Sequence, residues 1–230
     1  MKIESARALV TGGSSGIGFE IAKQLRQRGA EVVICGRDAA KLEKAAREID
    51  VIPIVADVAL EAEVIRLVAE TIEKVGAGYN VLVNNAGFGS FAPLVETSLE
   101  EMERVFATNV FGAMVAGRES ARHFVRQQAG NIINISSTAG GRGFAGGTAY
   151  CASKFALSGM TECWRAELRK SNVRVMQINP SEVQTEFFKA RAFSERKLQS
   201  EEIAHAALAM LGMEDRGFIT ELAVWATNPD

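Results

Sequence analysis

Apolar residues follow two alternating patterns along the chain, and together the patterns predict an α/β fold. Short runs rich in Val and Ile show no polar alternation, which is typical of strands buried on both faces of a parallel sheet. Between these runs, apolar residues recur at helical spacing, as in Ile17, Ile21 and Leu25. Strand then helix, repeated, predicts a doubly wound parallel sheet of about seven strands with helices on both faces. The predicted strands are Ala8–Val10, Glu31–Cys35, Val51–Ala56, Asn80–Val83, Asn131–Ile135, Val173–Ile178 and Phe218–Trp225.

Composition and charge then narrow the class of protein. With 47% hydrophobic and 23% charged residues, the chain has ordinary soluble globular composition. The net charge of -2 gives no electrostatic case for a nucleic acid or membrane partner. The charged N-terminus is unlike a secretion signal and no apolar run reaches the length of a membrane span, so we expect a cytoplasmic protein. The glycine-rich stretch Gly140–Gly147 is predicted as a loop, and residues 1–230 as one domain.

The cysteines indicate neither a disulfide framework nor a metal site. Cys35, Cys151 and Cys163 form no Cys-x-x-Cys pair, and no histidine stands close to them in the sequence. We therefore expect free, mostly buried thiols and no bound metal.

The segment after the first predicted strand has the pattern of a pyrophosphate site. A glycine turn that joins a strand to a helix N-terminus lets the backbone N–H groups approach phosphate oxygens. A tight turn without a ligand is the alternative, and the position of this turn after the first strand favours binding. The residues predicted to hold the phosphates are Gly12, Ser14, Ser15, Gly16, Ile17 and Gly18.

The end of the second predicted strand bears on the choice of cofactor. NAD-selective sites place a carboxylate here for the ribose 2′-OH, but this chain has Gly36 followed by Arg37. Because the Arg37 guanidinium can bind a 2′-phosphate, we favour NADP(H), with NAD(H) as the alternative. A plainer interpretation makes Arg37 a solvated side chain and Asp38 the N-cap of the next helix.

Tyr150 and Lys154 form the strongest candidate for proton transfer. They stand at i and i+4, so a phenol and an ammonium share one helix face. A nearby positive charge favours the phenolate and lowers the phenol pKa toward neutrality. Ser137 follows a buried strand at the edge where ligands bind in open α/β sheets, and its hydroxyl can donate to a substrate oxygen. The pair alone is a common helix spacing, so the prediction depends on Ser137 and the glycine turn together.

These motifs resemble the short-chain dehydrogenase/reductase family from about Arg7 to Thr185. Four motifs occur in the family's order: Thr-Gly-x3-Gly-Ile-Gly at Thr11–Gly18, Asn-Asn-Ala-Gly at Asn84–Gly87, Ser137 before Tyr150, and Tyr-x3-Lys at Tyr150–Lys154. The resemblance implies a Rossmann-like fold and an oxidoreductase that moves hydride between a nicotinamide cofactor and a carbonyl or secondary alcohol.

Roles for single residues follow from the same resemblance. It implies that Ser137 polarises the substrate oxygen, Tyr150 transfers the proton, and Lys154 lowers the Tyr150 pKa while holding the nicotinamide ribose. It implies that Asn109 holds a water that links Lys154 to solvent. The remaining cofactor contacts that it implies are Asp57, Val58, Asn85, Ala86, Gly87, Pro180, Val183 and Thr185, besides Tyr150 and Lys154 themselves.

The family also bears on assembly and on the substrate. Its members often associate through the tyrosine-bearing helix and the long helix before the fifth strand, so we expect a homodimer or homotetramer. Trp164 is expected to pack in the core, or to join such an interface if exposed. The predicted substrate wall comprises Phe88–Leu94, Thr138–Thr148 and the segment after Thr185, at about residues 186–200, with Phe88, Phe91, Phe144, Phe187, Phe188 and Phe193 making it aromatic.

Two features set this chain apart from the family pattern. Ser181 and Glu182 stand where relatives commonly have glycine after proline, so a carboxylate is expected near the nicotinamide. Lys189, Arg191, Arg196 and Lys197 attract an acidic substrate or form a solvated helix face, and the solvated face is favoured. A cofactor-binding sensor or regulatory protein without turnover is the alternative function, and a purely structural oligomer leaves the phosphate turn unexplained.

Overall fold

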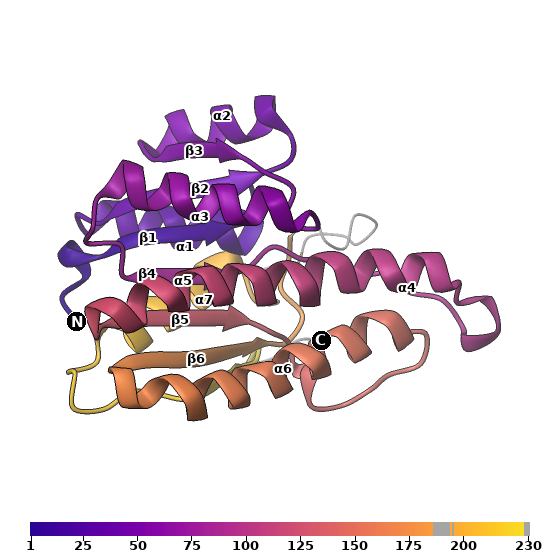
Figure 1. The fold of residues 1–230 in the computed structure, drawn as a ribbon. Coiled ribbons are helices and arrows are strands. Elements are labelled where there is room, and N and C mark those ends of the chain that lie inside the picture. The colour runs from indigo at the N-terminus through magenta and orange to yellow at the C-terminus, as the bar shows by residue number, and fades with distance from the viewer. Residues whose placement is uncertain (186–193, 195, 228–230) are drawn as a thin grey trace.

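The computed structural model describes residues 1–185, 194 and 196–227, and its centre is a parallel β-sheet (Figure 1). The strand order is β3-β2-β1-β4-β5-β6-β7, and every neighbouring pair is parallel. The predicted doubly wound sheet is therefore confirmed, with strand ends shifted by at most a few residues. The strands are β1 (Arg7–Thr11), β2 (Glu31–Gly36), β3 (Ile52–Val55), β4 (Val81–Asn84), β5 (Gly130–Ile135), β6 (Val173–Pro180) and β7 (Glu221–Val224).

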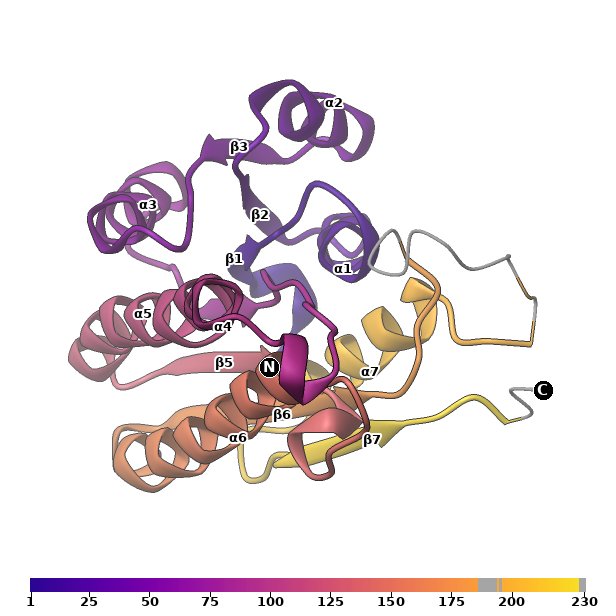
Figure 2. The same cartoon turned by 90° about the vertical axis from the view of Figure 1, so that its right-hand side faces the viewer.

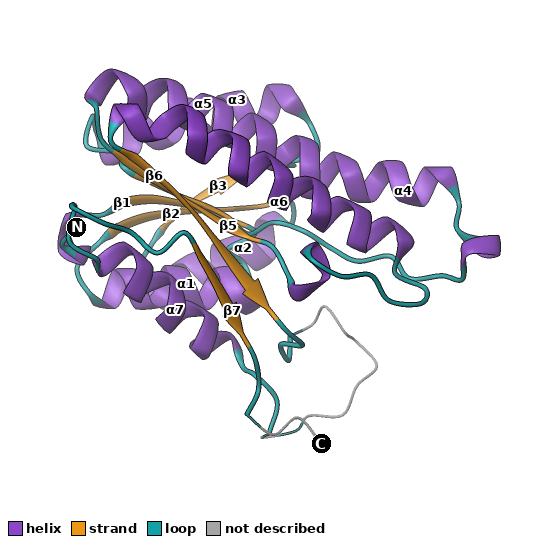
Figure 3. Ribbon diagram, turned by 90° about the horizontal axis from the view of Figure 1, so that it is seen from below, coloured by secondary structure: helices purple, strands orange, loops and turns teal. Residues whose placement is uncertain are grey.

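Helices cover both faces of this sheet (Figures 2 and 3). One face carries α1 (Gly16–Gln27), α2 (Ala39–Ile49) and α7 (Ser200–Gly212). The other carries α3 (Glu61–Val75), α5 (Ala113–Gln127) and α6 (Thr148–Leu168), and α4 (Leu99–Phe106) leads into α5 through a π-helical turn, Ala107–Gly112. Short 3-10 turns lie at Ile3–Ser5, Leu94–Glu96, Thr138–Gly140 and Arg169–Ser171. Two apolar clusters, one on each face, form the core. None of the helices in the described residues is long and apolar enough to cross a membrane.

Local sequence signals explain where several helices begin and end. Asp38 caps α2 by accepting a hydrogen bond of 3.0 Å from the backbone N–H of Lys41, as the N-cap interpretation predicts. The same helix ends at Asp50 in the left-handed conformation, with a φ of 55°. Gln199 and Glu202 form a reciprocal capping box at the start of α7.

A series of hydrogen bonds between buried polar side chains joins the middle of the sheet to α6. Asn84 Nδ2 donates to Asn134 Oδ1 at 3.0 Å, and Asn134 Nδ2 donates to Thr161 Oγ1 at 2.8 Å. All three side chains are buried, so these hydrogen bonds are costly to break. They fix the position of α6, the helix that carries Tyr150 and Lys154, against β4 and β5.

The strand order also determines where a ligand can enter. β1 pairs with β2 on one side and with β4 on the other, so the winding of the sheet reverses between β1 and β4. In open α/β sheets the crevice outside the carboxyl ends of the strands at such a point is the usual binding place.

Candidate functional site

A cavity of about 1250 Å³ opens at the carboxyl edge of the sheet and collects most of the predicted site residues. It runs from the β1–α1 turn, past the ends of β2 and β3, to the loops after β5 and β6. The predicted residues on its lining are Gly12, Ser14, Ser15, Gly16, Ile17, Arg37, Asp57, Val58, Asn85, Ala86, Gly87, Ser137, Tyr150, Lys154, Pro180, Val183 and Thr185. Gly18 and Asn109 do not line the cavity but lie next to residues that do.

The glycine turn presents backbone donors to one end of the cavity. Gly12 and Gly16 have φ values of 65° and 57°, a region that favours glycine. A Cβ on Gly12 would lie 2.9 Å from the Cα of Ala86, so the turn also depends on close backbone approach. Ser15, the N-cap residue of α1, makes no side-chain capping hydrogen bond. The first N–H groups of α1 are therefore left for an anion, which fits the phosphates of a dinucleotide.

Thr11 and Asn85 hold this turn in place from behind. The Thr11 hydroxyl accepts hydrogen bonds of 3.0 Å from the backbone N–H groups of Asn85 and Ala86. Asn85 Nδ2 donates to the carbonyl oxygens of Thr11 and Gly12 at 2.9 and 3.1 Å. A Cβ on Gly18 would lie 2.3 Å from Asn85 Nδ2. The absence of a side chain at Gly18 therefore leaves room for the Asn85 side chain. The sequence does not indicate the structural role of Thr11, because its hydrogen-bond partners lie far along the chain.

Arg37 and Asp57 lie at the other side of the turn, where the adenosine end of a dinucleotide would fit. Arg37 Nη1 stands 3.9 Å from Asp57 Oδ2, and the Arg37 side chain is 68% exposed. Asp57 Oδ1 also accepts a hydrogen bond of 2.9 Å from the backbone N–H of Ala59. A Cβ on Gly36 would lie 3.4 Å from Ser14 Oγ, so a hydroxyl stands close to the end of β2. This corner thus combines the Arg37 guanidinium, the Ser14 hydroxyl and the Asp57 carboxylate, while the end of β2 itself carries no acidic side chain.

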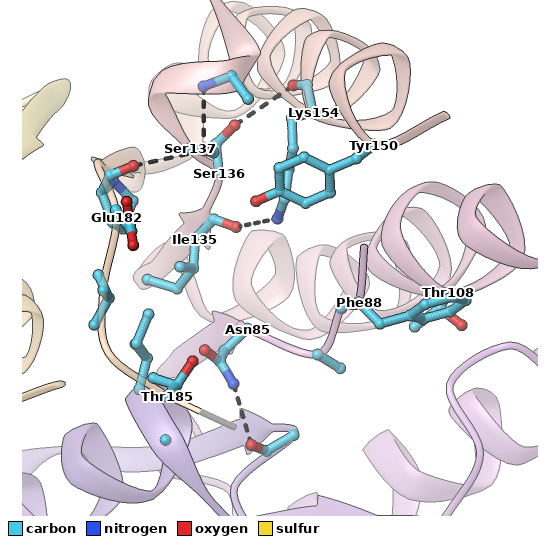
Figure 4. Close-up of a pocket in the computed structure, with 18 of the residues that line it drawn as sticks. Asn85, Phe88, Thr108, Ile135, Ser136, Ser137, Tyr150, Lys154, Glu182 and Thr185 are labelled. Carbon is cyan, nitrogen blue, oxygen red and sulfur yellow. Dashed lines mark hydrogen bonds between the residues drawn. The ribbon is translucent and has the colours of Figure 1, made fainter. Parts of the chain in front are cut away.

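Lys154 and Tyr150 point from α6 toward the end of β5 (Figure 4). Lys154 Nζ donates a hydrogen bond of 2.8 Å to the carbonyl oxygen of Ile135 and stands 5.8 Å from the centre of the Tyr150 ring. Burial lowers the pKa of Lys154 to about 8. Burial also raises the pKa of Tyr150, and this effect outweighs a hydrogen bond with Ser137 that lowers it. Burial therefore works against the lowering of the Tyr150 pKa, and the role of Lys154 in that lowering stays a prediction.

Ser136 and Ser137 have different surroundings although they are neighbours. Ser137 Oγ accepts a hydrogen bond of 3.1 Å from the backbone N–H of Ala139 and so caps the short turn after β5. The same hydroxyl faces Tyr150 and the cavity, which is where the sequence places a donor for a substrate oxygen. Ser136 is buried, and its hydroxyl contacts Ser158 Oγ and the backbone oxygen of Lys154.

Asn109 is buried in the π-helical turn and joins two walls of the cavity. Its Nδ2 donates to the carbonyl oxygen of Phe88 at 2.9 Å and to Ser153 Oγ at 3.0 Å, and its Oδ1 accepts from the Phe88 N–H. Ser153 in turn donates to the Tyr150 carbonyl oxygen at 2.7 Å. Both amide hydrogens of Asn109 are thus engaged with protein. Its role in holding a water stays a prediction, and π-helical turns are frequent at functional sites.

Glu182, the departure from the family pattern, is paired across the cavity wall. Lys197 Nζ donates to Glu182 Oε1 at 2.8 Å, and both residues line the cavity. Val183 bridges to Leu198, and the Gln184 N–H donates to the Leu198 carbonyl oxygen at 2.8 Å. Ser181 has no positive φ and its N–H donates to the Val224 carbonyl oxygen, so serine is accommodated here without strain.

Aromatic side chains cover the substrate end of the cavity. The rings of Phe91 and Tyr150 meet edge to face with centroids 5.5 Å apart, and Phe91 lies 6.0 Å from Phe144. Phe88 also lines the cavity. Of the other predicted wall and charge residues, Phe187, Phe188, Lys189, Arg191 and Phe193 lie outside the described residues, and Arg196 is exposed. Within the described part of the chain, no group of acidic, cysteine or histidine side chains could hold a metal ion.

Known proteins resemble this chain in both sequence and fold. An L-xylulose reductase from Caenorhabditis elegans is 40% identical over 187 residues, which cover 78% of this chain and 72% of the relative. The structure of an alcohol dehydrogenase from the archaeon Thermococcus sibiricus, complexed with 5-hydroxy-NADP, superposes with a TM-score of 0.89 at 26% identity, covering 97% of this chain and 98% of that one. A metagenomic short-chain oxidoreductase in complex with NADP superposes with a TM-score of 0.87 at 31% identity, covering 99% of this chain and all of the other.

The family assignment follows from the motifs, the cavity and these relatives together. The short chain dehydrogenase model matches residues 6–195, which include the glycine turn, Asn109, Ser137 and the Tyr150–Lys154 pair. The chain belongs to the short-chain dehydrogenase/reductase family of oxidoreductases.

Proposed function

We propose that this protein is an NADP(H)-dependent oxidoreductase that interconverts a carbonyl and a secondary alcohol, with residues 1–230 acting as one catalytic domain. The observation that carries the proposal is the convergence of Ser137, Tyr150 and Lys154 on one cavity. The other end of that cavity is a glycine turn whose helix N–H groups carry no side-chain cap. A dinucleotide that spans the cavity would place its reactive ring beside Tyr150.

Tyr150 is the proposed general acid for reduction. A nicotinamide cofactor, when bound, would supply the hydride for the carbonyl carbon, and the Tyr150 hydroxyl donates its proton to the carbonyl oxygen. Ser137 donates a hydrogen bond to the same oxygen as negative charge develops there. The raised pKa of Tyr150 keeps the phenol protonated near neutral pH, which suits the reductive direction.

Lys154, whose ammonium faces the Tyr150 ring, assists the same proton transfer. Since burial lowers its pKa only to about 8, the ammonium is mostly protonated near pH 7. Its fixed place against Ile135 leaves two further N–H groups, and these can bind hydroxyls of the nicotinamide ribose. Asn109 keeps Tyr150 and the Phe88 loop at a constant separation through Ser153 and is therefore a positioning residue.

The choice of NADP(H) over NAD(H) rests on the corner formed by Arg37 and Ser14. The exposed guanidinium of Arg37 is free to turn toward a 2′-phosphate, because its ion pair with Asp57 is long. Exposed pairs of this kind contribute little, so they compete weakly with a dianionic phosphate. The relatives solved in complex with 5-hydroxy-NADP and with NADP support the same choice.

The proposed assembly is a homodimer or homotetramer formed through α5 and α6. Phe111 and Phe155 leave 56% and 47% of their surface exposed near this pair of helices. Trp164 is partly buried and packs against the core beside Gly117, as its helical spacing indicates. A monomer by light scattering at micromolar concentration would contradict the assembly.

The central test measures NADPH and NADH oxidation against a broad panel of carbonyl compounds, with the Tyr150→Phe variant beside the wild type. Loss of a general acid lowers kcat by about 100-fold or more while cofactor binding persists. Wild-type rates in the variant would disprove the assigned chemistry. Binding of NADPH without turnover of any carbonyl would favour a cofactor-binding sensor.

A further inference from the structure

Arg142 is a charged residue at the substrate end of the cavity that the proposed chemistry does not use. It follows the short turn Thr138–Gly140 after β5 and lines the cavity with Phe144 and Trp225. Its guanidinium carbon lies over the Trp225 ring, 4.8 Å from the ring centre. Trp225 directly follows β7, so the contact joins two segments far apart in the sequence, and both side chains are exposed.

The other charges around the cavity are compensated or lie elsewhere. Glu182 and Lys197 form an ion pair of 2.8 Å and cancel one another. Lys154 is buried against the carbonyl oxygen of Ile135. Arg37 and Asp57 belong to the adenosine end. Over residues 1–185, 194 and 196–227, no carboxylate forms an ion pair with Arg142, so its positive charge at the substrate end is not neutralised.

The stacking on Trp225 suits Arg142 for recognising an anion. A cation over an aromatic face is held by the ring quadrupole and uses none of its N–H groups for that contact. The planar guanidinium can then offer two parallel N–H donors to one carboxylate. Tryptophan holds the arginine side chain in place, so less conformational entropy is lost when the anion binds.

We propose that Arg142 binds a carboxylate group of the substrate, so that the physiological substrate is an oxo acid and its product the corresponding hydroxy acid. This inference rests on the proposed function, because Ser137 and Tyr150 must hold the reacting carbonyl. Phe91 and Phe144 then cover the carbon chain between the two polar groups, since both rings line the cavity beside Tyr150.

The test compares matched acids and methyl esters as substrates. Short 2-oxo and 3-oxo carboxylates, each beside its methyl ester, are assayed for NADPH oxidation by the wild type and by Arg142→Gln. A charge-assisted pair of this kind changes affinity by about 10- to 100-fold. We therefore expect the acid-to-ester ratio of kcat/KM to fall by about that factor in Arg142→Gln, mainly through KM. Arg126→Gln, which removes an exposed charge from α5 outside the cavity lining, is the matched control.

A second measurement covers the case in which the best substrate has another carbon skeleton. Butanoate and butanamide are compared as competitive inhibitors against whichever carbonyl the enzyme reduces. Stronger inhibition by butanoate that Arg142→Gln removes would support the inference.

The outcomes separate the inference from the proposed function. An acid-to-ester ratio that Arg142→Gln leaves unchanged, or turnover confined to neutral carbonyls with equal inhibition by both compounds, overturns the carboxylate assignment while the oxidoreductase function stands. Absence of NADPH oxidation with every carbonyl contradicts the proposed function itself.

Discussion

Lys154 Nζ donates a hydrogen bond to the carbonyl oxygen of Ile135, the last residue of β5. The lysine is thus held at the edge of the sheet, and its ammonium also stands over the Tyr150 ring, 5.8 Å from the ring centre. Burial at this position is what lowers its pKa to about 8. The group therefore changes charge close to the pH at which the enzyme would work.

This pKa predicts a pH dependence of NADPH binding. The anionic cofactor favours the protonated ammonium, so its binding raises the Lys154 pKa above the value in the free protein. Affinity is then constant below the free pKa and falls as the pH rises through about 8, by up to about tenfold per pH unit. The measurement is the Kd for NADPH by fluorescence between about pH 6.5 and about pH 9.5.

Lys154→Met is the comparison for that titration. We expect weaker binding in this variant with little slope between about pH 7 and about pH 9, because Tyr150, with its raised pKa, does not titrate there. The same slope in variant and wild type would assign the titration to another group.

Gly18→Ala should destabilise the protein although Gly18 is not on the cavity lining. The added methyl would lie 2.3 Å from Asn85 Nδ2 and 2.5 Å from the Gly12 carbonyl oxygen, so the hydrogen bonds from Asn85 must shift. Overpacking of this kind costs about 1–3 kcal/mol. Urea unfolding of Gly18→Ala and of Gly141→Ala, where a Cβ meets nothing within 4 Å, checks the expectation. Equal midpoints for the two variants would contradict it.

The Glu182–Lys197 ion pair predicts that a second substitution restores NADPH affinity lost by the first. Lys197→Met removes one positive charge beside the Glu182 carboxylate, so the cavity wall becomes more negative and repels an anionic cofactor. We expect a Kd for NADPH several times higher in Lys197→Met, and recovery in the double variant with Glu182→Gln. Since both side chains are partly exposed, the effect of the pair on stability is within about 1 kcal/mol. A double variant as weak as Lys197→Met would show that Lys197 acts on the cofactor directly.

Glycine-to-alanine substitutions in two helices should have opposite effects on stability. Gly159 is exposed in the middle of α6 and a Cβ there meets nothing within 4 Å, so Gly159→Ala should stabilise by about 0.5–1 kcal/mol. A Cβ on Gly117 in α5 would lie 2.9 Å from the Trp164 ring, so Gly117→Ala should destabilise. Thermal unfolding of both variants measures the difference, and a shift in the same direction would refute the packing argument.

The sheet could be predicted from the sequence because its strands are buried on both faces. Ile132 and Ile133 are both fully buried in β5, and such unbroken apolar runs are easy to recognise. The glycine turn and the catalytic motifs were found for a related reason, since each is contiguous in the sequence. The bounds of the last strand were predicted less accurately, because its apolar run extends beyond the residues that pair with β6.

Contacts between distant segments could not be predicted in the same way. The hydroxyl of Thr11 binds N–H groups after β4, and Arg142 meets Trp225 across the mouth of the cavity. The spacing of Tyr150 and Lys154 gives their proximity but not their burial. Desolvation, which depends on the whole fold, raises the pKa of Tyr150.

The packing of α1 against α7 has a consequence for synthesis of the protein. Ile21 and Leu25 of α1 share a core cluster with Ile203 and Ala207 of α7, so the helix that begins at the phosphate turn is covered by an element that is translated much later. Ribosomes add about 5–20 residues per second, so α1 waits on the order of ten seconds or more for its neighbour. During that interval its apolar face is open to chaperones and to aggregation, and a nascent chain gains a complete nucleotide site only after α7 has left the exit tunnel.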